Sequence, residues 1–215
     1  MKAYDAQSLL ALGAEELGVT LSEEKNDQLC HYLRLLQKWN KTYNLTALKE
    51  EREMVTLHLL DSLTILPYLK GQDFIDIGTG AGLPGIVIAI CRPECAMTLL
   101  DSNGKKTRFL NQAKQELELK NIEVVHSRSS DYQPKCRFDG VLSRAFATLK
   151  DMTDNAAHLV ADNGRFWAMK GQYPRQEIEE LDSEYIVELC QSLRIPETTA
   201  ERHLVELSTS RKNLD

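Results

Sequence analysis

The chain has 215 residues, 42% hydrophobic and 27% charged, which is ordinary for a globular protein of one domain, with or without an appendage. No apolar run reaches the ~18 residues that a membrane span requires, and the N-terminal segment lacks the apolar stretch of a signal peptide. The five cysteines are scattered without a C-x-x-C pair. We therefore expect reduced thiols, a cytoplasmic protein and no metal site.

The net charge of −6 is unevenly distributed along the chain. Residues 71–150 hold 11 lysines and arginines against 9 acids, whereas the segments before and after them carry net charges of −2 and −6. The overall charge argues mildly against a nucleic-acid partner, but the net-positive segment is compatible with a local surface that faces phosphate. Chance variation explains the difference equally well.

Helical spacing dominates the first 70 residues. Apolar side chains recur at helical intervals within residues 21–45, and Thr20 or Ser22 can cap the start of that helix. Residues 54–69 predict a further helix, which ends near Pro67. The sequence therefore predicts an N-terminal helical extension. The apolar positions of the first helix are Leu29, Leu33, Leu36 and Trp39.

From residue 73 onward, short apolar strands alternate with helices, which predicts a mostly parallel sheet with both faces covered. Two final apolar runs follow a short acidic helix, and the link between them is too short for a parallel crossover. We therefore expect a terminal antiparallel hairpin on a seven-stranded, Rossmann-like sheet, and we divide the chain into an extension (1–70) and this domain (71–215). The predicted strands are 73–77, 96–101, 122–126, 138–143, 164–170, 184–193 and 201–209, and the predicted helices are 84–92, 105–120, 149–161 and 175–182.

The stretch DFIDIGTGAGLPG, residues 73–85, contains two overlapping glycine patterns. One is G-x-G-x-G from Gly78, and the other is G-x-G-x-x-G from Gly80, which is typical of dinucleotide sites. A glycine loop after the first strand lies where open α/β sheets bind ligands. Asp101 ends the second strand and fits either cofactor class, because both use an acid there to accept ribose hydroxyls. A turn that serves only strand–helix packing is the alternative.

Pro84 and Asp76 favour S-adenosylmethionine over a dinucleotide. A pyrophosphate binds free N–H groups at a helix N-terminus, and Pro84, expected in the first turn, removes one of them. S-adenosylmethionine carries no phosphate, and a carboxylate at Asp76 suits its cationic sulfonium or ammonium group while it would repel a pyrophosphate. The terminal hairpin agrees, since nicotinamide-binding folds usually continue with parallel strands.

Several motifs together resemble the RsmG (GidB) family of methyltransferases that act on small-subunit ribosomal RNA. The resemblance extends from about residue 20 to ERHLV at 201–205. Its motifs are DIGTGAGLPG, LLDSNGKKTRFL (99–110), SRAFA (143–147), Lys170-Gly171, WNKTYNLTA (39–47) and HLLDSL (58–63). It implies the Rossmann-like class I fold of S-adenosylmethionine-dependent methyltransferases, and transfer of a methyl group to N7 of a guanine.

The same resemblance implies a target and partners. The guanine would lie in the 530 loop of 16S rRNA, at position 527 in the usual bacterial numbering. The cofactor would be S-adenosyl-L-methionine, which leaves as S-adenosyl-L-homocysteine. The RNA would be met in a small ribosomal subunit or an assembly intermediate, and we expect a monomeric protein.

The strand ends and the resemblance also assign roles around the cofactor. The three glycines from Gly78 would wrap its methionine part, with Leu83 packing nearby. Asp101 would accept the ribose hydroxyls, and the serines after the third strand would meet the adenine edge, mainly through their backbone. Alternatives remain, because Asp101 can cap the following helix and Arg144 can form a structural ion pair. The predicted cofactor-binding residues are Gly78, Gly80, Gly82, Leu83, Asp101, Ser129, Ser130 and Arg144.

Methyl transfer to guanine N7 needs no general base, because N7 carries a lone pair and no proton. The sequence accordingly offers no clear Ser-His-Asp or Cys-His set, and His58 is the one histidine considered for a role. RNA contacts would come from side chains near the strand ends, although the basic helix 105–108 can be a solvated face and Phe146 can be core. The predicted RNA-contacting residues are Lys105, Lys106, Arg108, Arg128, Phe146, Lys170 and Arg175.

Two other functions stay open from sequence. One is a nicotinamide-dependent oxidoreductase, which only the G-x-G-x-x-G pattern favours. The other is a non-catalytic, cofactor-binding protein that takes part in ribosome assembly.

Overall fold

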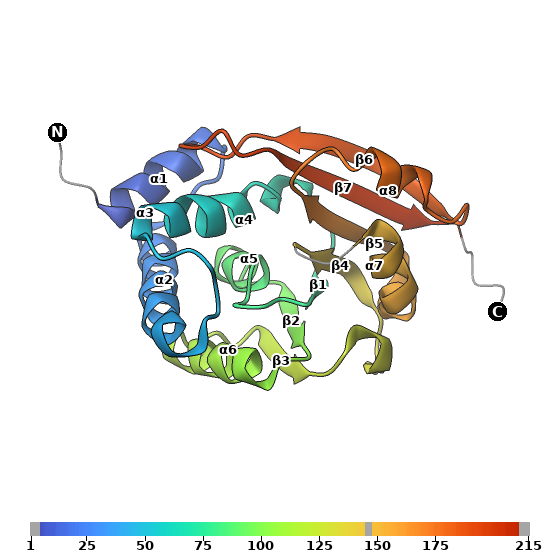
Figure 1. Ribbon diagram of the computed structural model, residues 1–215. Coiled ribbons are helices and arrows are strands. Elements are labelled where there is room, and N and C mark those ends of the chain that lie inside the picture. The colour runs from blue at the N-terminus through green and yellow to red at the C-terminus, as the bar shows by residue number, and fades with distance from the viewer. Residues whose placement is uncertain (1–4, 145–147, 211–215) are drawn as a thin grey trace.

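A computed structural model describes residues 5–144 and 148–210, and Phe146 lies outside this range. Its centre is one seven-stranded sheet in the order β3-β2-β1-β4-β5-β7-β6 (Figure 1). The first five strands of this order are parallel, whereas β7 runs antiparallel to both β5 and β6. The predicted fold class is thus confirmed. The strands are β1 (Asp73–Ile77), β2 (Ala96–Asp101), β3 (Ile122–His126), β4 (Phe138–Ser143), β5 (Val160–Lys170), β6 (Tyr185–Leu193) and β7 (Arg202–Thr209).

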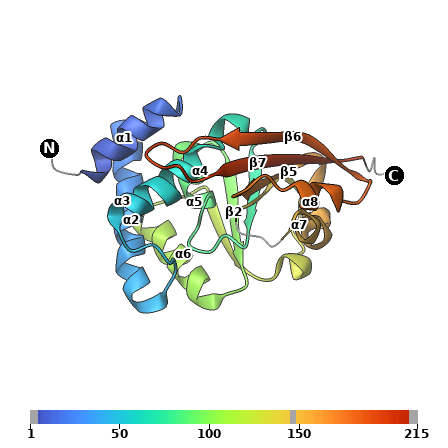
Figure 2. The same ribbon diagram turned by 45° about the horizontal axis from the view of Figure 1, so that its top comes forward.

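Helices cover both faces of the sheet. Alternate strand residues point to opposite faces, and both faces carry apolar side chains that the helices bury. In β1, Phe74 belongs to the core under helices α1 to α6, and Ile75 belongs to the core under α7 and α8. Figure 2 shows the two helical layers on either side of the sheet. The helices are α1 (Ala6–Glu16), α2 (Glu23–Tyr43), α3 (Glu51–Met54), α4 (Asp61–Leu63), α5 (Gly85–Cys91), α6 (Gly104–Glu116), α7 (Leu149–Ala156) and α8 (Arg175–Glu179).

The N-terminal helices share a single hydrophobic core with the sheet. Tyr32 on α2 is fully buried, its ring lies 6.3 Å from that of Phe109 on α6, and its hydroxyl donates to the carbonyl of Ala81 in the glycine loop at 2.7 Å. Ser22 caps α2, as predicted, by accepting from the N–H of Lys25 at 3.3 Å. The extension therefore contacts the glycine loop directly, through Tyr32 on α2.

The predicted helix 54–69 is replaced by a series of short segments. Helix α3 leads into a π-helix, η1 (Val55–Leu60), then α4, and finally a 3-10 turn, η2 (Leu66–Tyr68). Apolar periodicity indicates a buried helix but does not distinguish i→i+4 from i→i+5 hydrogen bonding. π-Helical turns are rare and are frequently found at functional sites.

Two other predicted helix boundaries are also wrong. The predicted helix 105–120 ends at Glu116, and two residues later Glu118 adopts a left-handed φ of 53°. Helix 149–161 ends at Ala156 and continues as a 3-10 turn, η4 (Ala157–Leu159), so that β5 begins at Val160 rather than 164. Residues 161–163, which include the polar Asp162 and Asn163, are part of this strand. No helix in the described part of the chain has the length and apolarity needed to cross a membrane.

Candidate active site

The loop between β1 and α5 is built on three glycines with left-handed backbone. Gly78 and Gly80 have φ of 63°, and Gly82 has φ of 93°. A Cβ at Gly80 would have no heavy atom nearer than 3.9 Å, whereas a Cβ at Gly82 would lie 2.7 Å from Ile86 Cγ1 and 2.9 Å from Leu110 Cδ2. Gly80 therefore faces open space, and Gly82 is required by packing as well as by its φ.

The second half of this loop has no N–H groups to offer an anion. The N–H groups of Gly82 and Leu83 both donate to the carbonyl of Thr79, at 2.9 and 3.1 Å. Gly85 N–H donates to the Asp76 carboxylate at 2.8 Å, and Ile86 N–H donates to the carbonyl of Gly82 at 2.7 Å. Pro84 caps α5 rather than lying in its first turn, and it has no N–H at all. A pyrophosphate would find no cradle here, which agrees with the preference drawn from the sequence.

Asp76 lies beneath the loop, not beside a ligand. Its side chain is completely buried, and Oδ2 accepts from the Thr79 hydroxyl at 2.6 Å and from Gly85 N–H at 2.8 Å. Oδ1 is buried without a hydrogen-bond partner in the described structure. Burial raises the pKa of this carboxyl to about 6, although both hydrogen bonds act to lower it. Asp76 thus holds the loop in shape from within the core.

This raised pKa predicts how stability depends on pH. Between about pH 4 and pH 6 the native protein binds a proton at Asp76 that the unfolded chain has lost, so its contribution to stability falls as pH rises. Asp76→Asn removes the effect. The free energy of unfolding of the variant minus that of the wild type should therefore rise by on the order of 2 kcal/mol between pH 4 and pH 6.5. Urea unfolding at several pH values measures this difference. Stability curves that stay parallel across the window would contradict it.

A pocket of about 300 Å³ opens at the carboxyl ends of β1, β2 and β3. It brings together five residues predicted from the sequence, which are Gly78, Asp101, Arg128, Ser129 and Ser130. This is the edge of the sheet, beside the switch between β1 and β4, where open α/β folds bind ligands. The remaining lining residues are Leu100, Ser102, Ser127 and Asn155.

Asp101 is nearly buried in this pocket. Its Oδ2 accepts from Gly80 N–H at 2.9 Å and lies 3.5 Å from Lys106 Nζ, and its Oδ1 accepts from Asn103 N–H at 2.8 Å. The cap of α6 is Asn103, whose side chain accepts from Lys105 N–H at 2.9 Å. Asp101 therefore does not cap the helix, and it ties the glycine loop to the end of β2.

Other predicted residues lie around the pocket or apart from it. Leu83 is buried in the core below the loop and does not line the pocket. Lys170, at the end of β5, pairs with Glu177 at 2.7 Å. Three further cations, Lys105, Arg108 and Arg175, are exposed. These positions leave the predicted cofactor and RNA contacts as predictions.

Arg144 directly follows β4 and lies in a buried ion cluster. Its Nη1 donates to the carbonyl of Leu57 at 3.0 Å and to Asp61 Oδ2 at 3.3 Å. Arg202, the first residue of β7, meets the same carboxylate through Nε at 2.6 Å and Nη2 at 3.0 Å. The ion-pair alternative for Arg144 is thus what the structure contains. The sequence pattern does not single out Asp61 or Arg202, because a charged residue within an apolar run is usually solvent-exposed.

His58 is buried next to this cluster and stays neutral. Burial, and then the charge of Arg144, lower its pKa to about 4. Its Nε2 lies 2.8 Å from the Thr46 hydroxyl and its Nδ1 lies 3.1 Å from the carbonyl of Leu57. An Nδ1–H that donates to Leu57 and an Nε2 that accepts from Thr46 satisfy both ring nitrogens. His58 therefore does not change charge near neutral pH and links Thr46 to the backbone of η1.

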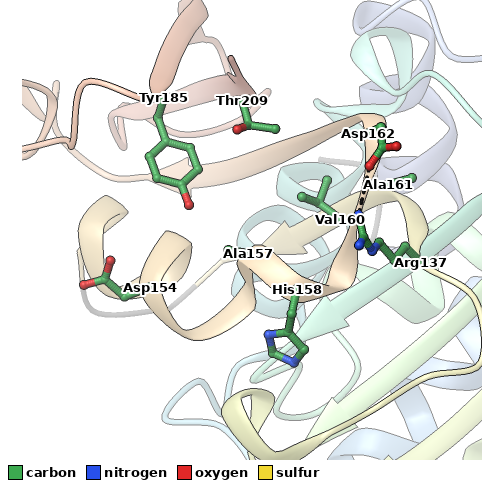
Figure 3. A pocket seen from close by; sticks show the side chains of 9 residues that line it. All are labelled: Arg137, Asp154, Ala157, His158, Val160, Ala161, Asp162, Tyr185 and Thr209. Atoms are coloured by element: carbon green, nitrogen blue, oxygen red, sulfur yellow. Dashed lines mark hydrogen bonds and ion pairs between the residues drawn. The ribbon is translucent and has the colours of Figure 1, made fainter. Parts of the chain in front are cut away.

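A second hollow, of about 290 Å³, lies at the other end of the strands, where β5 begins (Figure 3). It is bounded by the first residues of β5 and β6 and the last residue of β7, with an Arg137–Asp162 ion pair along one side. His158 on its wall is held by the carbonyl of Tyr132 at 2.9 Å. The amino ends of parallel strands are not where this fold binds ligands, so we do not place the active site there. No group of three potential metal ligands occurs within the described ranges.

Comparison with known proteins shows the family to which this chain is similar. A family model described as GidB, rRNA small subunit methyltransferase G, matches residues 25–205. The chain belongs to this family. The ribosomal RNA small subunit methyltransferase G of Saccharophagus degradans is 50% identical over 200 residues, which are 93% of this chain and 90% of that protein. The protein of the same name from Escherichia coli O1:K1 / APEC is 48% identical over 202 residues, 94% of this chain and 98% of that protein.

A solved structure shares the fold at low identity. Coclaurine N-methyltransferase, bound to N-methylheliamine and SAH, has a TM-score of 0.55 at 11% identity, and the match covers 88% of this chain and 75% of that one. Membership in the rRNA small subunit methyltransferase G family identifies this chain as a methyltransferase, and the nicotinamide-dependent alternative falls away. The resemblance stated from the sequence is therefore confirmed.

Proposed function

We propose that this chain transfers the methyl group of S-adenosyl-L-methionine to N7 of a guanine in the 530 loop of 16S rRNA, at position 527. The observation that carries the proposal is the pocket at the carboxyl ends of β1 to β3, in a chain of the rRNA small subunit methyltransferase G family. The nucleotide and its N7 atom come from the motif resemblance. We expect a monomer that acts in the cytoplasm on the small subunit or an assembly intermediate.

The pocket suits a cofactor with a nucleoside and no phosphate. Asp101 accepts hydrogen bonds from three protein groups, and a carboxylate has about four acceptor sites, so capacity remains for a ribose hydroxyl. Gly78 and Gly80 would approach the methionine part closely, since a Cβ at Gly80 would point into open space. Ser129 and Ser130 would meet the adenine edge. The N–H groups of the loop from Gly82 onward are already used, so the site would select against pyrophosphate.

The chemistry asks little of the protein beyond alignment. When bound, the cofactor supplies an electrophilic methyl group on a sulfonium. Guanine N7 already has a free lone pair, so no side chain has to remove a proton, and the neutral, fully bonded His58 fits that expectation. The protein's residues would hold the base in line with the methyl group and exclude competing orientations. Basic side chains on the rim, such as Arg128 and Lys105, would bind RNA phosphates.

Methyl transfer to defined RNA tests the proposal. The purified protein is incubated with S-adenosylmethionine and with either 30S subunits or protein-free 16S rRNA, each from a strain that lacks the modification. Mass spectrometry of nuclease fragments should show one N7-methylguanosine in the fragment that contains position 527. A methyl group on another atom or nucleotide would overturn the specificity. Cofactor binding without transfer to either RNA would instead favour the non-catalytic assembly protein, and the two substrates separate free from assembled RNA.

A further inference from the structure

The carboxylate of Asp61 organises two arginines that lie 83 and 141 residues further along the chain. It is completely buried on α4 and accepts three hydrogen bonds from guanidinium groups, two from Arg202 and one from Arg144. Arg202 binds it side-on through Nε and Nη2, which fixes the plane of that guanidinium. Arg144 is fixed by a second acceptor, the carbonyl of Leu57 in the π-helix η1. Both arginines are thus held in one orientation.

This cluster lies at the carboxyl ends of the strands, on the side of the sheet centre that the cofactor pocket does not occupy. The pocket occupies the ends of β3, β2 and β1, whereas Arg144 follows the adjacent β4. Arg202 reaches the same edge because β7 is antiparallel to β5 and its His203 pairs with Lys170, the last residue of β5. A methyl acceptor has to approach the donor from this side. The arginine pair therefore stands where a substrate would pass.

The charge of the cluster favours an anionic ligand. Two guanidinium groups share one carboxylate, which leaves a net charge of +1, and each arginine side chain is still 18% exposed. Arg202 Nη1 and Arg144 Nε and Nη2 make no hydrogen bond or ion pair within the described structure. A buried ion cluster is seldom more stabilising than apolar packing, so stability alone does not account for it.

We propose that Asp61 is a positioning residue, which holds Arg144 and Arg202 so that their free N–H groups bind backbone phosphate of the RNA beside the target nucleotide. The inference rests on the proposed function, because it takes the anion to be RNA. It gives the N-terminal extension a role in substrate binding, since Asp61 and Leu57 both belong to it. Asp61 itself touches no substrate.

The variant Asp61→Asn tests this proposal through the direction of its effect. Simple electrostatics predicts tighter RNA binding when a negative charge is removed near the RNA. Positioning predicts the reverse, because the guanidinium groups lose their fixed orientation, and the Kd for protein-free 16S rRNA should rise by about 10- to 100-fold. Binding is measured at several salt concentrations, together with methyl transfer to the same RNA and with the Kd for S-adenosylmethionine, which tests separately the cofactor contact predicted for Arg144.

Glu206→Gln provides a matched control. Glu206 is also a nearly buried carboxylate paired with an arginine, Arg165 at 3.5 Å, but it lies within β7 away from the carboxyl edge. It should cost stability without changing RNA binding or activity. Equal RNA affinity for Asp61→Asn and wild type, or tighter binding by the variant, would overturn the inference.

Further outcomes keep the two proposals apart. If Asp61→Asn does not fold, Arg202→Lys is measured instead, because lysine keeps the charge but lacks the fork that binds Asp61 side-on. Its Kd for the RNA should rise by about 10-fold, and full retention of affinity would overturn the inference. If the wild type itself transfers no methyl group to 16S rRNA, the proposed function fails. If it does and Asp61→Asn behaves identically, only the positioning role fails.

Discussion

Replacing Asp101 with alanine is expected to weaken S-adenosylmethionine binding by about 10- to 100-fold, because the ribose hydroxyls lose an ionised acceptor whose hydrogen bonds are worth about 1.5–3 kcal/mol. The same change leaves Gly80 N–H without its partner and loosens the glycine loop. Isothermal titration calorimetry on the folded variant measures the affinity directly. Asp101→Asn keeps an acceptor for Gly80 N–H but loses the charge. Its affinity for the cofactor should lie between those of the wild type and Asp101→Ala.

Asn103→Ala is the control for this result. Asn103 caps α6, so its loss should cost about 1 kcal/mol of stability through the helix terminus alone. Its affinity for the cofactor should match that of the wild type. If Asp101→Ala binds the cofactor as tightly as wild type does, then Asp101 serves only to join the loop to β2, and the proposed ribose contact is wrong.

Alanine at Gly82 is expected to reduce the free energy of unfolding by about 2–4 kcal/mol, since it combines a left-handed backbone with overpacking of a filled core. The new methyl would overlap Ile86 and lie 2.9 Å from Leu110 Cδ2. Urea denaturation measures the loss, as a lower midpoint with an unchanged slope.

Gly80→Ala separates strain from packing. It has the same unfavourable sign of φ but open space around the added methyl, so we expect it to lose only about 1–2 kcal/mol of stability. If Gly80 faces the bound cofactor, this variant should bind S-adenosylmethionine poorly although it folds well. Equal destabilisation of the two variants would mean that the backbone conformation, and not contact with Ile86 and Leu110, limits position 82.

The features that the sequence predicted well are those fixed by local chemistry. The glycine spacing, a proline without an N–H and an acid at the end of the next strand each constrain a few neighbouring residues. Their joint placement then follows from one rule, because the carboxyl ends of parallel strands meet at one edge. That is why Gly78, Asp101 and Ser129, which are far apart in sequence, line one pocket in the structure.

The features that the sequence did not reveal depend on distant partners. Asp61 lies in an apolar stretch, and nothing local indicates that Arg202, which is 141 residues away, will neutralise it. The π-helix η1 has the same apolar spacing as an ordinary buried helix. The position of Asp76 before the loop predicts a carboxylate beside a ligand, but the direction of its side chain depends on which face of β1 it occupies. Each of these required knowledge of the tertiary structure.

The place of β7 between β5 and β6 has a consequence for how the protein is made. β7 follows β5 and β6 in the sequence but lies between them in the sheet, so among the described strands neither has its β7 neighbour until residues 202–209 have left the ribosome. Arg202 arrives with this strand. A chain that has been synthesised only as far as β6 therefore lacks Arg202 and cannot assemble the arginine pair around Asp61.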